Sequence, residues 1–135
     1  KTVKYAVDIF PDHIIEFSTN AEEIYYKIDN IYLTRVITNV VKNGIQAIHH
    51  QDKKVKVEIE NLEDRFFIKI QDNGSGISEE NKDKVFEKKF TTKSTGMGLG
   101  LFMVKKIIED YEGKIWFESK EDEGTTFFIE FLKKY

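Results

Sequence analysis

The most regular hydrophobic pattern in the chain is a helical one. Apolar residues recur three and four positions apart over residues 33–48, which places them on one side of a helix. Asp29 and Asn30 stand just before this pattern and predict its N-cap. A second helix is expected over residues 101–111, with Gly113 acting as its C-cap.

Alternating apolar and polar residues predict the strands. Residues 55–59 and 66–70 alternate in this way and are joined by a short polar segment, so we expect an antiparallel hairpin. Two further strands are expected at residues 114–118 and 125–132. Helices interleaved with hairpins predict an α+β fold, a two-layer α/β sandwich in which helices pack on one face of a mixed β-sheet.

The pattern is less regular in two other segments. Residues 3–10 alternate loosely and end at Pro11, the only proline, which predicts a strand closed by a turn. A second extended stretch is expected over residues 14–28, with a break at residues 18–20. Residues 78–100 are polar, rich in Lys and then in Gly, and predict a long loop with one short helical turn at 79–86. Connections of this length are commonly functional lids or else disordered, and the aromatic Phe86 and Phe90 favour a segment that can dock. We expect one 135-residue domain with a lid at about residues 78–100.

The composition fits one folded domain. Hydrophobic residues make up 40% of the positions and aromatic residues 13%, which is enough to fill a core and excludes disorder of the whole chain. The net charge of -3 gives no general field that would hold nucleic acid or an anionic membrane, so neither is expected as a partner of this domain. The sequence has no cysteine, which excludes disulfides, thiolate catalysis and cysteine-bound metal centres.

Amide side chains gather on one side of the first predicted helix. Asn39, Asn43 and Gln46 fall at i, i+4 and i+7, so they share a face beside the apolar stripe. A solvated helix surface is the alternative reading. Asn is a poor helix former, however, and two of them one turn apart destabilise a helix interior without an evident structural return. An amide oxygen is a competent ligand for Mg²⁺, which takes its other ligands from water and phosphates.

A carboxylate followed by two glycines stands at the end of the second hairpin strand. Asp72 closes the strand, and Gly74 and Gly76 follow it in a loop whose backbone can approach a ligand closely. A plain Asp-Asn-Gly turn is the alternative reading, with equal weight for this segment taken alone. The spacing does not match a dinucleotide-binding fingerprint, because Glu79 stands where a third glycine would fall.

Alternating glycines lead directly into the second predicted helix. Gly96, Gly98 and Gly100 leave backbone N–H groups free to converge on an anion, and the helix dipole adds to the attraction. A phosphate suits such a site, and Lys93 lies just upstream, where it could add a cationic donor. A flexible hinge is the alternative reading.

Taken in order, these segments resemble the four boxes of the GHKL ATPase and kinase superfamily. The N box is similar to residues 39–47, the G1 box to 72–77, the F box to 86–93 and the G2 box to 96–101, with a terminal glycine-threonine strand at 124–127. The order and spacing are those of the ATP-binding catalytic domain of two-component sensor histidine kinases. Gln46 and the Thr-Thr-Lys at the end of the F box look more like the nitrogen-regulation subgroup of these kinases.

This resemblance implies a Bergerat fold that binds Mg²⁺-ATP between helices, under a lid. Asn43 would ligate Mg²⁺, and Asp72 would accept a hydrogen bond from the adenine amino group. The other residues expected to contact the nucleotide are Asn39, Gly74, Gly76 and Ile77, either Thr125 or Thr126 beside the adenine, and Lys93, Gly96, Gly98, Leu99 and Gly100 around the phosphates.

One position separates kinases from ATPases within the superfamily. Chaperone, gyrase and MutL relatives carry a Glu four residues before the magnesium Asn, where it activates the hydrolytic water. This chain has Asn39 there, and an amide cannot act as that base. The resemblance therefore implies transfer of the γ-phosphoryl group to a histidine rather than hydrolysis. His13, His49 and His50 lack the acid and proline context of a phosphoacceptor box, so the acceptor is expected on a separate dimerisation domain.

The expected setting is two-component signal transduction in the cytoplasm, whether or not the parent protein is anchored in the inner membrane. The expected partners are the dimerisation domain that carries the acceptor histidine and, downstream, the receiver domain of a response regulator. The isolated domain is expected to be monomeric. Two alternatives stay open, a serine kinase of the anti-sigma-factor type and a module that senses ATP without transferring its phosphoryl group.

Overall fold

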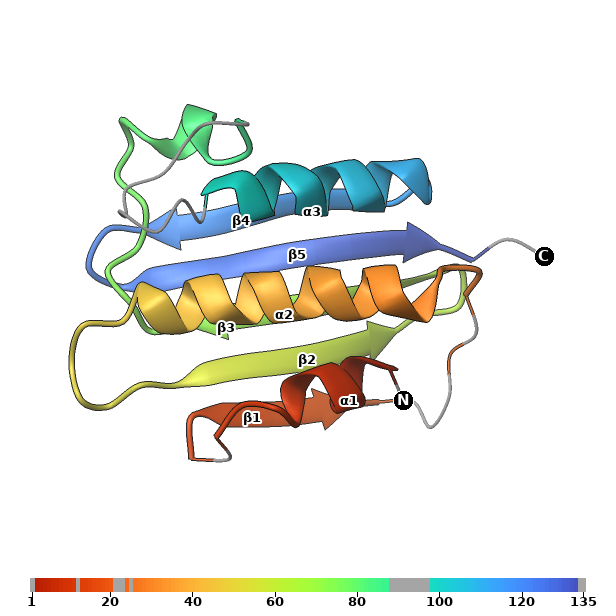
Figure 1. The fold of residues 1–135 in the computed structure, drawn as a ribbon, viewed down its shortest axis with the longest axis horizontal. Helices are drawn as coiled ribbons and strands as arrows, with labels where there is room; N and C mark the ends of the chain where they lie inside the picture. Colours follow the sequence, from red (N-terminus) through yellow and green to blue (C-terminus); the bar gives the residue numbers. More distant parts are fainter. Residues whose placement is uncertain (1, 12, 21–23, 25, 88–97, 134–135) are drawn as a thin grey trace.

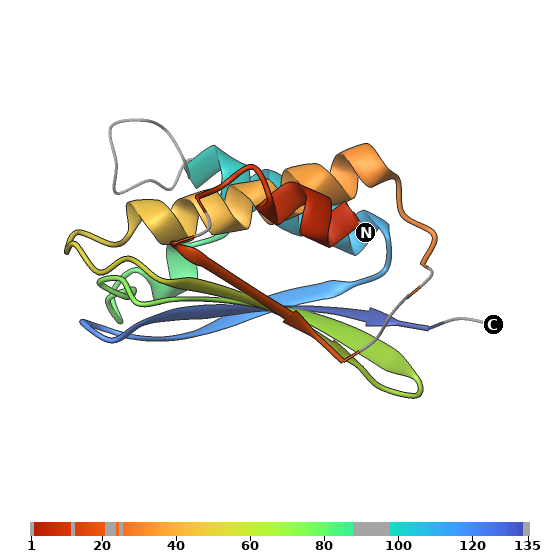
Figure 2. The same cartoon turned by 90° about the horizontal axis from the view of Figure 1, so that it is seen from below.

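The computed structural model describes residues 2–11, 13–20, 24, 26–87 and 98–133. Within these residues, five strands form one mixed sheet, and three α-helices cover one of its faces (Figures 1 and 2). The strand order is β1-β2-β3-β5-β4, with β1 and β2 parallel and the other neighbours antiparallel. The predicted α+β sandwich is therefore confirmed. The elements are α1 (Thr2–Val7), β1 (Ile15–Thr19), α2 (Asn30–Gln46), β2 (Val55–Asn61), β3 (Arg65–Asp72), the 3₁₀ turn η1 (Lys82–Lys84), α3 (Gly98–Asp110), β4 (Lys114–Lys120) and β5 (Gly124–Leu132).

The helix α2 forms where the apolar stripe and the cap predicted it. The side chain of Asp29 accepts a hydrogen bond from the backbone N–H of Ile31 at 2.8 Å, which satisfies one of the free donors of the first turn. The stripe is buried against the sheet, and α2 lies between α1 and α3 in Figure 1. Its buried residues are Val36, Ile37, Val40, Val41 and Gly44.

The hairpin of β2 and β3 also forms as predicted, and its register fixes which side chains face the helices. In β3 the buried positions alternate, from Phe66 through Ile68 and Ile70 to Asp72. The last of these pairs with Val55 of β2 on one side and with Thr125 of β5 on the other. A carboxylate thus ends a row of core side chains on the helix-covered face.

The prediction of a strand at residues 3–10 is wrong, because this segment contains the helix α1. Val3, Ala6 and Val7 are buried, and their i, i+3, i+4 spacing is that of a helix face. Packing of this face against α2 overrides the strand preference of the β-branched residues. Of the extended stretch expected over residues 14–28, only Ile15–Thr19 forms a strand among the described residues, the short edge strand β1.

Gly113 follows the end of α3 as predicted, but the reason for a glycine at this position is packing. The residue in the left-handed conformation is Glu112, with φ of 65°, and not Gly113. A Cβ atom on Gly113 would lie 2.5 Å from Cε1 of Phe131, so glycine is required there for close packing. Gly113 still ends the helix through its N–H, which donates to the carbonyl of Ile108 at 2.8 Å.

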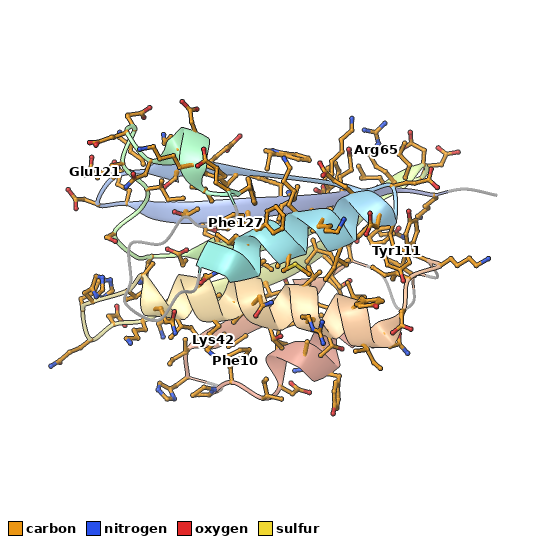
Figure 3. The ribbon with its side chains drawn as sticks, turned by 45° about the horizontal axis from the view of Figure 1, so that its top comes forward. Phe10, Lys42, Arg65, Tyr111, Glu121 and Phe127 are labelled. Atoms are coloured by element: carbon orange, nitrogen blue, oxygen red, sulfur yellow. The ribbon has the colours of Figure 1, made fainter. Side chains whose placement is uncertain are left out.

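Several element ends meet at one end of the sandwich. The end of α2, the end of β3, the turn between β4 and β5 and the start of α3 all lie there in Figure 1. In Figure 3, Glu121 marks this end, while Arg65 and Tyr111 mark the opposite one. The predicted helical turn of the lid segment is η1, and after it Phe86 packs against Phe127, with ring centroids 6.2 Å apart.

Candidate functional site

Asp72 is a buried carboxylate enclosed by its own loop and by α2. Only 6% of the residue is exposed, and Oδ1 accepts a hydrogen bond from the N–H of Gly74 at 2.9 Å. On the other side, a Cβ atom built on Gly44 would lie 3.3 Å from Cβ of Asp72 and 3.4 Å from Oδ2. The absence of a side chain at Gly44 therefore lets α2 lie directly over the carboxylate.

The loop after Asp72 is fixed to the elements on both sides of it. The N–H of Ser75 donates to the carbonyl of Ala47 at 3.0 Å, just after α2, and the N–H of Asp122 donates to the carbonyl of Ser75 at 2.7 Å. The N–H of Ile77 donates to Oγ of Ser119 at 2.8 Å. These bonds hold the loop between the end of α2 and the turn from β4 to β5.

The two glycines of this loop make their close approaches to protein backbone. A Cβ atom on Gly74 would lie 2.7 Å from the carbonyl oxygen of Ala47. Gly76 has φ of +75°, and a Cβ atom there would overlap the carbonyl oxygen of Lys120. The glycines are thus explained by packing within the protein, and their predicted contact with a ligand remains a prediction.

The sheet register distinguishes the two candidate threonines. Thr125 pairs with Asp72 across β3 and β5, so its side chain lies on the same face of the sheet, and it is 6% exposed. Thr126 pairs with the exposed Gln71 and therefore faces the opposite side. Only Thr125 lies beside the carboxylate.

The amide face of α2 connects the carboxylate to the start of α3. Asn43 directly precedes Gly44, and its side-chain nitrogen is buried without a hydrogen-bond partner in the described part of the chain. Asn39 lies one turn earlier, about 6 Å along the helix axis. Its amide lies next to Gly100 of α3, where a Cβ atom would be 3.8 Å from Cγ of Asn39. Gly44 thus brings α2 onto the acid, and Asn39 brings α2 onto the start of α3.

The helix α3 begins earlier than the sequence pattern predicted. Gly98, Leu99 and Gly100 form its first turn, where backbone N–H groups have no partner within the helix. Such groups and the helix dipole favour an anion. Lys93 and Gly96, with most of the predicted F box, lie outside the described residues.

Sequence reasoning missed two residues that organise this site. Ser119 occupies an inward position of β4, in line with the buried Ile115 and with Phe117. In the sequence, a polar residue at the end of this row of inward-facing residues could have indicated its role. Asn73 holds the segment before β2, because its side chain accepts from the N–H of Lys54 at 3.0 Å and donates to the carbonyl of Asp52 at 2.8 Å.

The resolved pKa shifts lie at the opposite end of β3. The hydrogen bond from Arg65 lowers the pKa of Asp64, and the same bond raises the pKa of Arg65. Arg65 also donates to the nearly buried Glu130 at 2.9 Å. This ion-pair group joins β3 to β5, and its distance from Asp72 assigns it to the fold rather than to the site.

Comparison with known proteins identifies the class to which this arrangement belongs. The family model of the histidine kinase-, DNA gyrase B- and HSP90-like ATPases matches residues 28–135. A Halalkalibacterium halodurans protein named a probable C4-dicarboxylate sensor kinase is 42% identical over 106 residues, which cover 76% of this chain and 20% of the relative. An NtrY-like sensor histidine kinase of Rickettsia conorii is 33% identical over 134 residues, which cover 96% of this chain and 22% of the relative.

Solved structures agree with these matches. The catalytic domain of the histidine kinase ThkA superposes with a TM-score of 0.85 at 32% identity, over 98% of this chain and 90% of that one. ThkA in complex with the response regulator TrrA gives a TM-score of 0.79 at 31% identity, over 98% of this chain and 40% of that one. The chain therefore belongs to the histidine kinase-, DNA gyrase B- and HSP90-like ATPase family, and within it to the catalytic domains of sensor histidine kinases.

Two further facts bear on the whole protein. The chain spans about a fifth of the length of the curated relatives it matches. Among the residues that the structure describes, no helix has both the length and the apolar character needed to cross a membrane.

Proposed function

We propose that this domain binds Mg²⁺-ATP and supplies the γ-phosphoryl group to a histidine on a separate dimerisation domain, in two-component signalling. The observation that carries the proposal is the contact between Gly44 and Asp72. This contact packs α2 against the buried carboxylate of Asp72. Asn43, whose amide nitrogen is buried, directly precedes Gly44 in the sequence. An ATP-binding domain is what the family match supports.

Asp72 is the proposed acceptor for the adenine amino group, and Thr125 lies on the same face next to it. A buried carboxylate discriminates well in this role, because a base without the donor would leave it unpaired. Ile77 and Gly76 follow in the fixed loop and would line the base. For the phosphates we propose the first turn of α3, formed by Gly98, Leu99 and Gly100, together with Gly96 and Lys93.

The side chain of Asn43 fits the proposed metal. Its amide nitrogen is buried and has no hydrogen-bond partner among the described residues. Buried polar groups are normally hydrogen-bonded, so a ligand at this position would fit. Because an amide can turn by 180° and exchange its two ends, the same position can present oxygen. Bound Mg²⁺ would neutralise phosphate charge. Asn43 would hold it from α2 while Asp72 orients the base.

Asn39 favours transfer over hydrolysis. Its amide lies against Gly100 at the start of α3, beside the proposed phosphate position. An amide side chain cannot remove a proton from water, so no general base is available at this place on α2. Transfer needs mainly positioning and charge neutralisation, with the nucleophile supplied from outside.

The structure of ThkA with its response regulator supports a receiver domain as the downstream partner. We propose that the domain works in the cytoplasm and is monomeric when isolated.

Calorimetry with and without Mg²⁺ tests the binding site. Asp72→Asn should lower ATP affinity on the order of 10- to 100-fold, because an amide N–H would oppose the adenine amino group. Asn43→Ala should remove most of the gain in affinity that Mg²⁺ gives the native chain. Thr126→Val, on the opposite face of the sheet, and the exposed neighbour Lys42→Ala should bind like the native chain. Unchanged affinity in the Asp72 variant would refute the adenine assignment.

A transfer assay tests the reaction. The chain is mixed with γ-labelled ATP, Mg²⁺ and a dimerisation domain that carries an acceptor histidine. Acid-labile label on that domain is expected, since phosphohistidine is lost in acid and phosphoserine is not. Acid-stable label on a serine would favour the anti-sigma-factor type of kinase. Tight ATP binding without transfer to any acceptor domain would favour a sensing module.

A further inference from the structure

The loop between α2 and β2 is tied to the first residue after Asp72. The side chain of Asn73 accepts from the N–H of Lys54 at 3.0 Å and donates to the carbonyl of Asp52 at 2.8 Å. The backbone carbonyl oxygen of Asn73 lies 2.9 Å from Nε2 of His50. This loop lies at the same end of the sandwich as the end of β3 in Figure 1. His50 thus connects the loop to the residue next to the proposed adenine acceptor.

The two hydrogen bonds of the His50 ring assign its proton. A backbone carbonyl can only accept, so Nε2 donates to Asn73. A backbone N–H can only donate, so Nδ1 accepts from Asp52 at 3.1 Å. These partners therefore assign the Nε2–H tautomer to His50. Each ring nitrogen has its own contact, one within the loop and the other across to Asn73.

The contact across to Asn73 ends on a peptide group that also contacts Asp72. In the peptide group between Asn73 and Gly74, the carbonyl accepts from His50 and the N–H donates to Oδ1 of Asp72 at 2.9 Å. Because a peptide group is planar, fixing its carbonyl also fixes the direction of its N–H. His50 is therefore connected to the carboxylate of Asp72 through one rigid group.

We propose that His50 is a positioning residue, which holds the carboxylate of Asp72 in its binding orientation through the Asn73–Gly74 peptide group. A purely local role, in which His50 only stabilises its own loop through Asp52, is the competing explanation. The inference rests on the proposed function, because it takes Asp72 to contact the nucleotide. It assigns a role in nucleotide binding to the loop after α2, outside the residues that would touch the nucleotide.

Two amide substitutions separate the two hydrogen bonds of the ring. His50→Gln places an amide N–H near the position of Nε2 and can still donate to Asn73. His50→Asn is too short for that contact, but its oxygen can accept from the N–H two residues later, as in an Asx turn. Glutamine therefore keeps the proposed role, and asparagine keeps only the local one. His50→Ala keeps neither.

Calorimetric titration of the 135-residue chain with Mg²⁺-ATP measures the effect on binding. His50→Asn and His50→Ala should each lower the affinity about 3- to 5-fold, within the effect of one exposed hydrogen bond. His50→Gln should bind within about twofold of the native chain. The control His49→Asn, at the exposed neighbouring histidine, should bind like the native chain. Native affinity in His50→Asn, or an equal loss in His50→Gln, would overturn the inference.

The amide proton of Gly74 reports the contact with Asp72 without any nucleotide. In NMR spectra of the isotope-labelled chain, its chemical shift should change in His50→Asn and stay near the native value in His50→Gln and His49→Asn. A purely local role of His50 would leave this signal unchanged in His50→Asn, and that result would overturn the inference. So would an Nδ1–H tautomer of the native His50 ring. Thermal melting checks that the variants fold. If His50→Asn does not fold, the same comparison is made between His50→Ala and His50→Gln.

The two measurements distinguish this inference from the function on which it depends. A native chain that fails to bind Mg²⁺-ATP refutes the proposed function. A native chain that binds Mg²⁺-ATP, with the same affinity in His50→Asn, refutes only the role of His50.

Discussion

Replacing Gly76 by alanine tests how firmly the loop after Asp72 is fixed. Gly76 has φ of +75°, in the left-handed region, and a Cβ atom there would overlap the carbonyl oxygen of Lys120. Both neighbours of this position are restrained, since Ser75 and Ile77 are hydrogen-bonded to flanking elements. The loop therefore cannot accept the methyl group by a small movement of its own.

The expected loss of stability has two parts. A non-glycine residue in the left-handed region costs about 1–2 kcal/mol. Forcing a methyl group against a backbone carbonyl in a packed region costs about 1–3 kcal/mol more. The sum is about 2–5 kcal/mol, and at about 3–4 °C per kcal/mol for a domain of this size the melting temperature should fall by about 6–20 °C.

Thermal melting by circular dichroism measures this change, with Gly100→Ala as the matched control. A Cβ atom on Gly100 would meet its nearest neighbour, Cγ of Asn39, at an ordinary 3.8 Å, and alanine is the better helix former by up to about 1 kcal/mol. The control should therefore melt at the native temperature or slightly above it. If Gly76→Ala melts within about 2 °C of the native chain, the loop is not fixed as the hydrogen bonds indicate.

Two further predictions concern the fold away from the loop. Gly113→Ala and Gly113→Asn should both destabilise the domain by about 1–3 kcal/mol in urea denaturation. In either variant the Cβ atom would lie 2.5 Å from Cε1 of Phe131. If asparagine is tolerated, Gly113 instead serves as a left-handed cap. Since Arg65 lowers the pKa of Asp64, that carboxylate contributes stability above its unfolded pKa of about 3.9, and the contribution is lost as the pH falls through the lower folded pKa. Asp64→Asn should flatten the fall in unfolding free energy between about pH 5 and pH 2, and a native-like slope would contradict this.

The features that the sequence predicted well depend on neighbouring residues. The helix α2, its cap at Asp29 and the hairpin of β2 and β3 follow from spacing and turn chemistry within short segments. The position of Asp72 at the end of a strand follows from regular alternation. The order of these pieces was enough to predict the family, which the comparisons confirm.

The features that it predicted poorly depend on distant contacts. The segment of α1 is short and rich in β-branched residues, and packing against α2 decides its conformation. Gly113 is needed because of Phe131, eighteen positions later in the chain and on another element. Thr125 and Thr126 are followed by two phenylalanines, so the local pattern does not alternate, and only pairing with β3 shows which threonine lies beside Asp72.

The composition of α2 makes physical sense only when the site and the core are considered together. Asn39, Asn43 and Gly44 are poor helix formers, and together they destabilise the helix by about 2 kcal/mol relative to alanine. The buried stripe from Val36 to Val41 offsets this loss, because burying one such side chain stabilises the fold by about 1.5–3 kcal/mol. Gly44 lies where α2 meets Asp72, and Asn39 lies where α2 meets Gly100. Packing against Asp72 accounts for Gly44, and we propose that ligand binding accounts for the two asparagines.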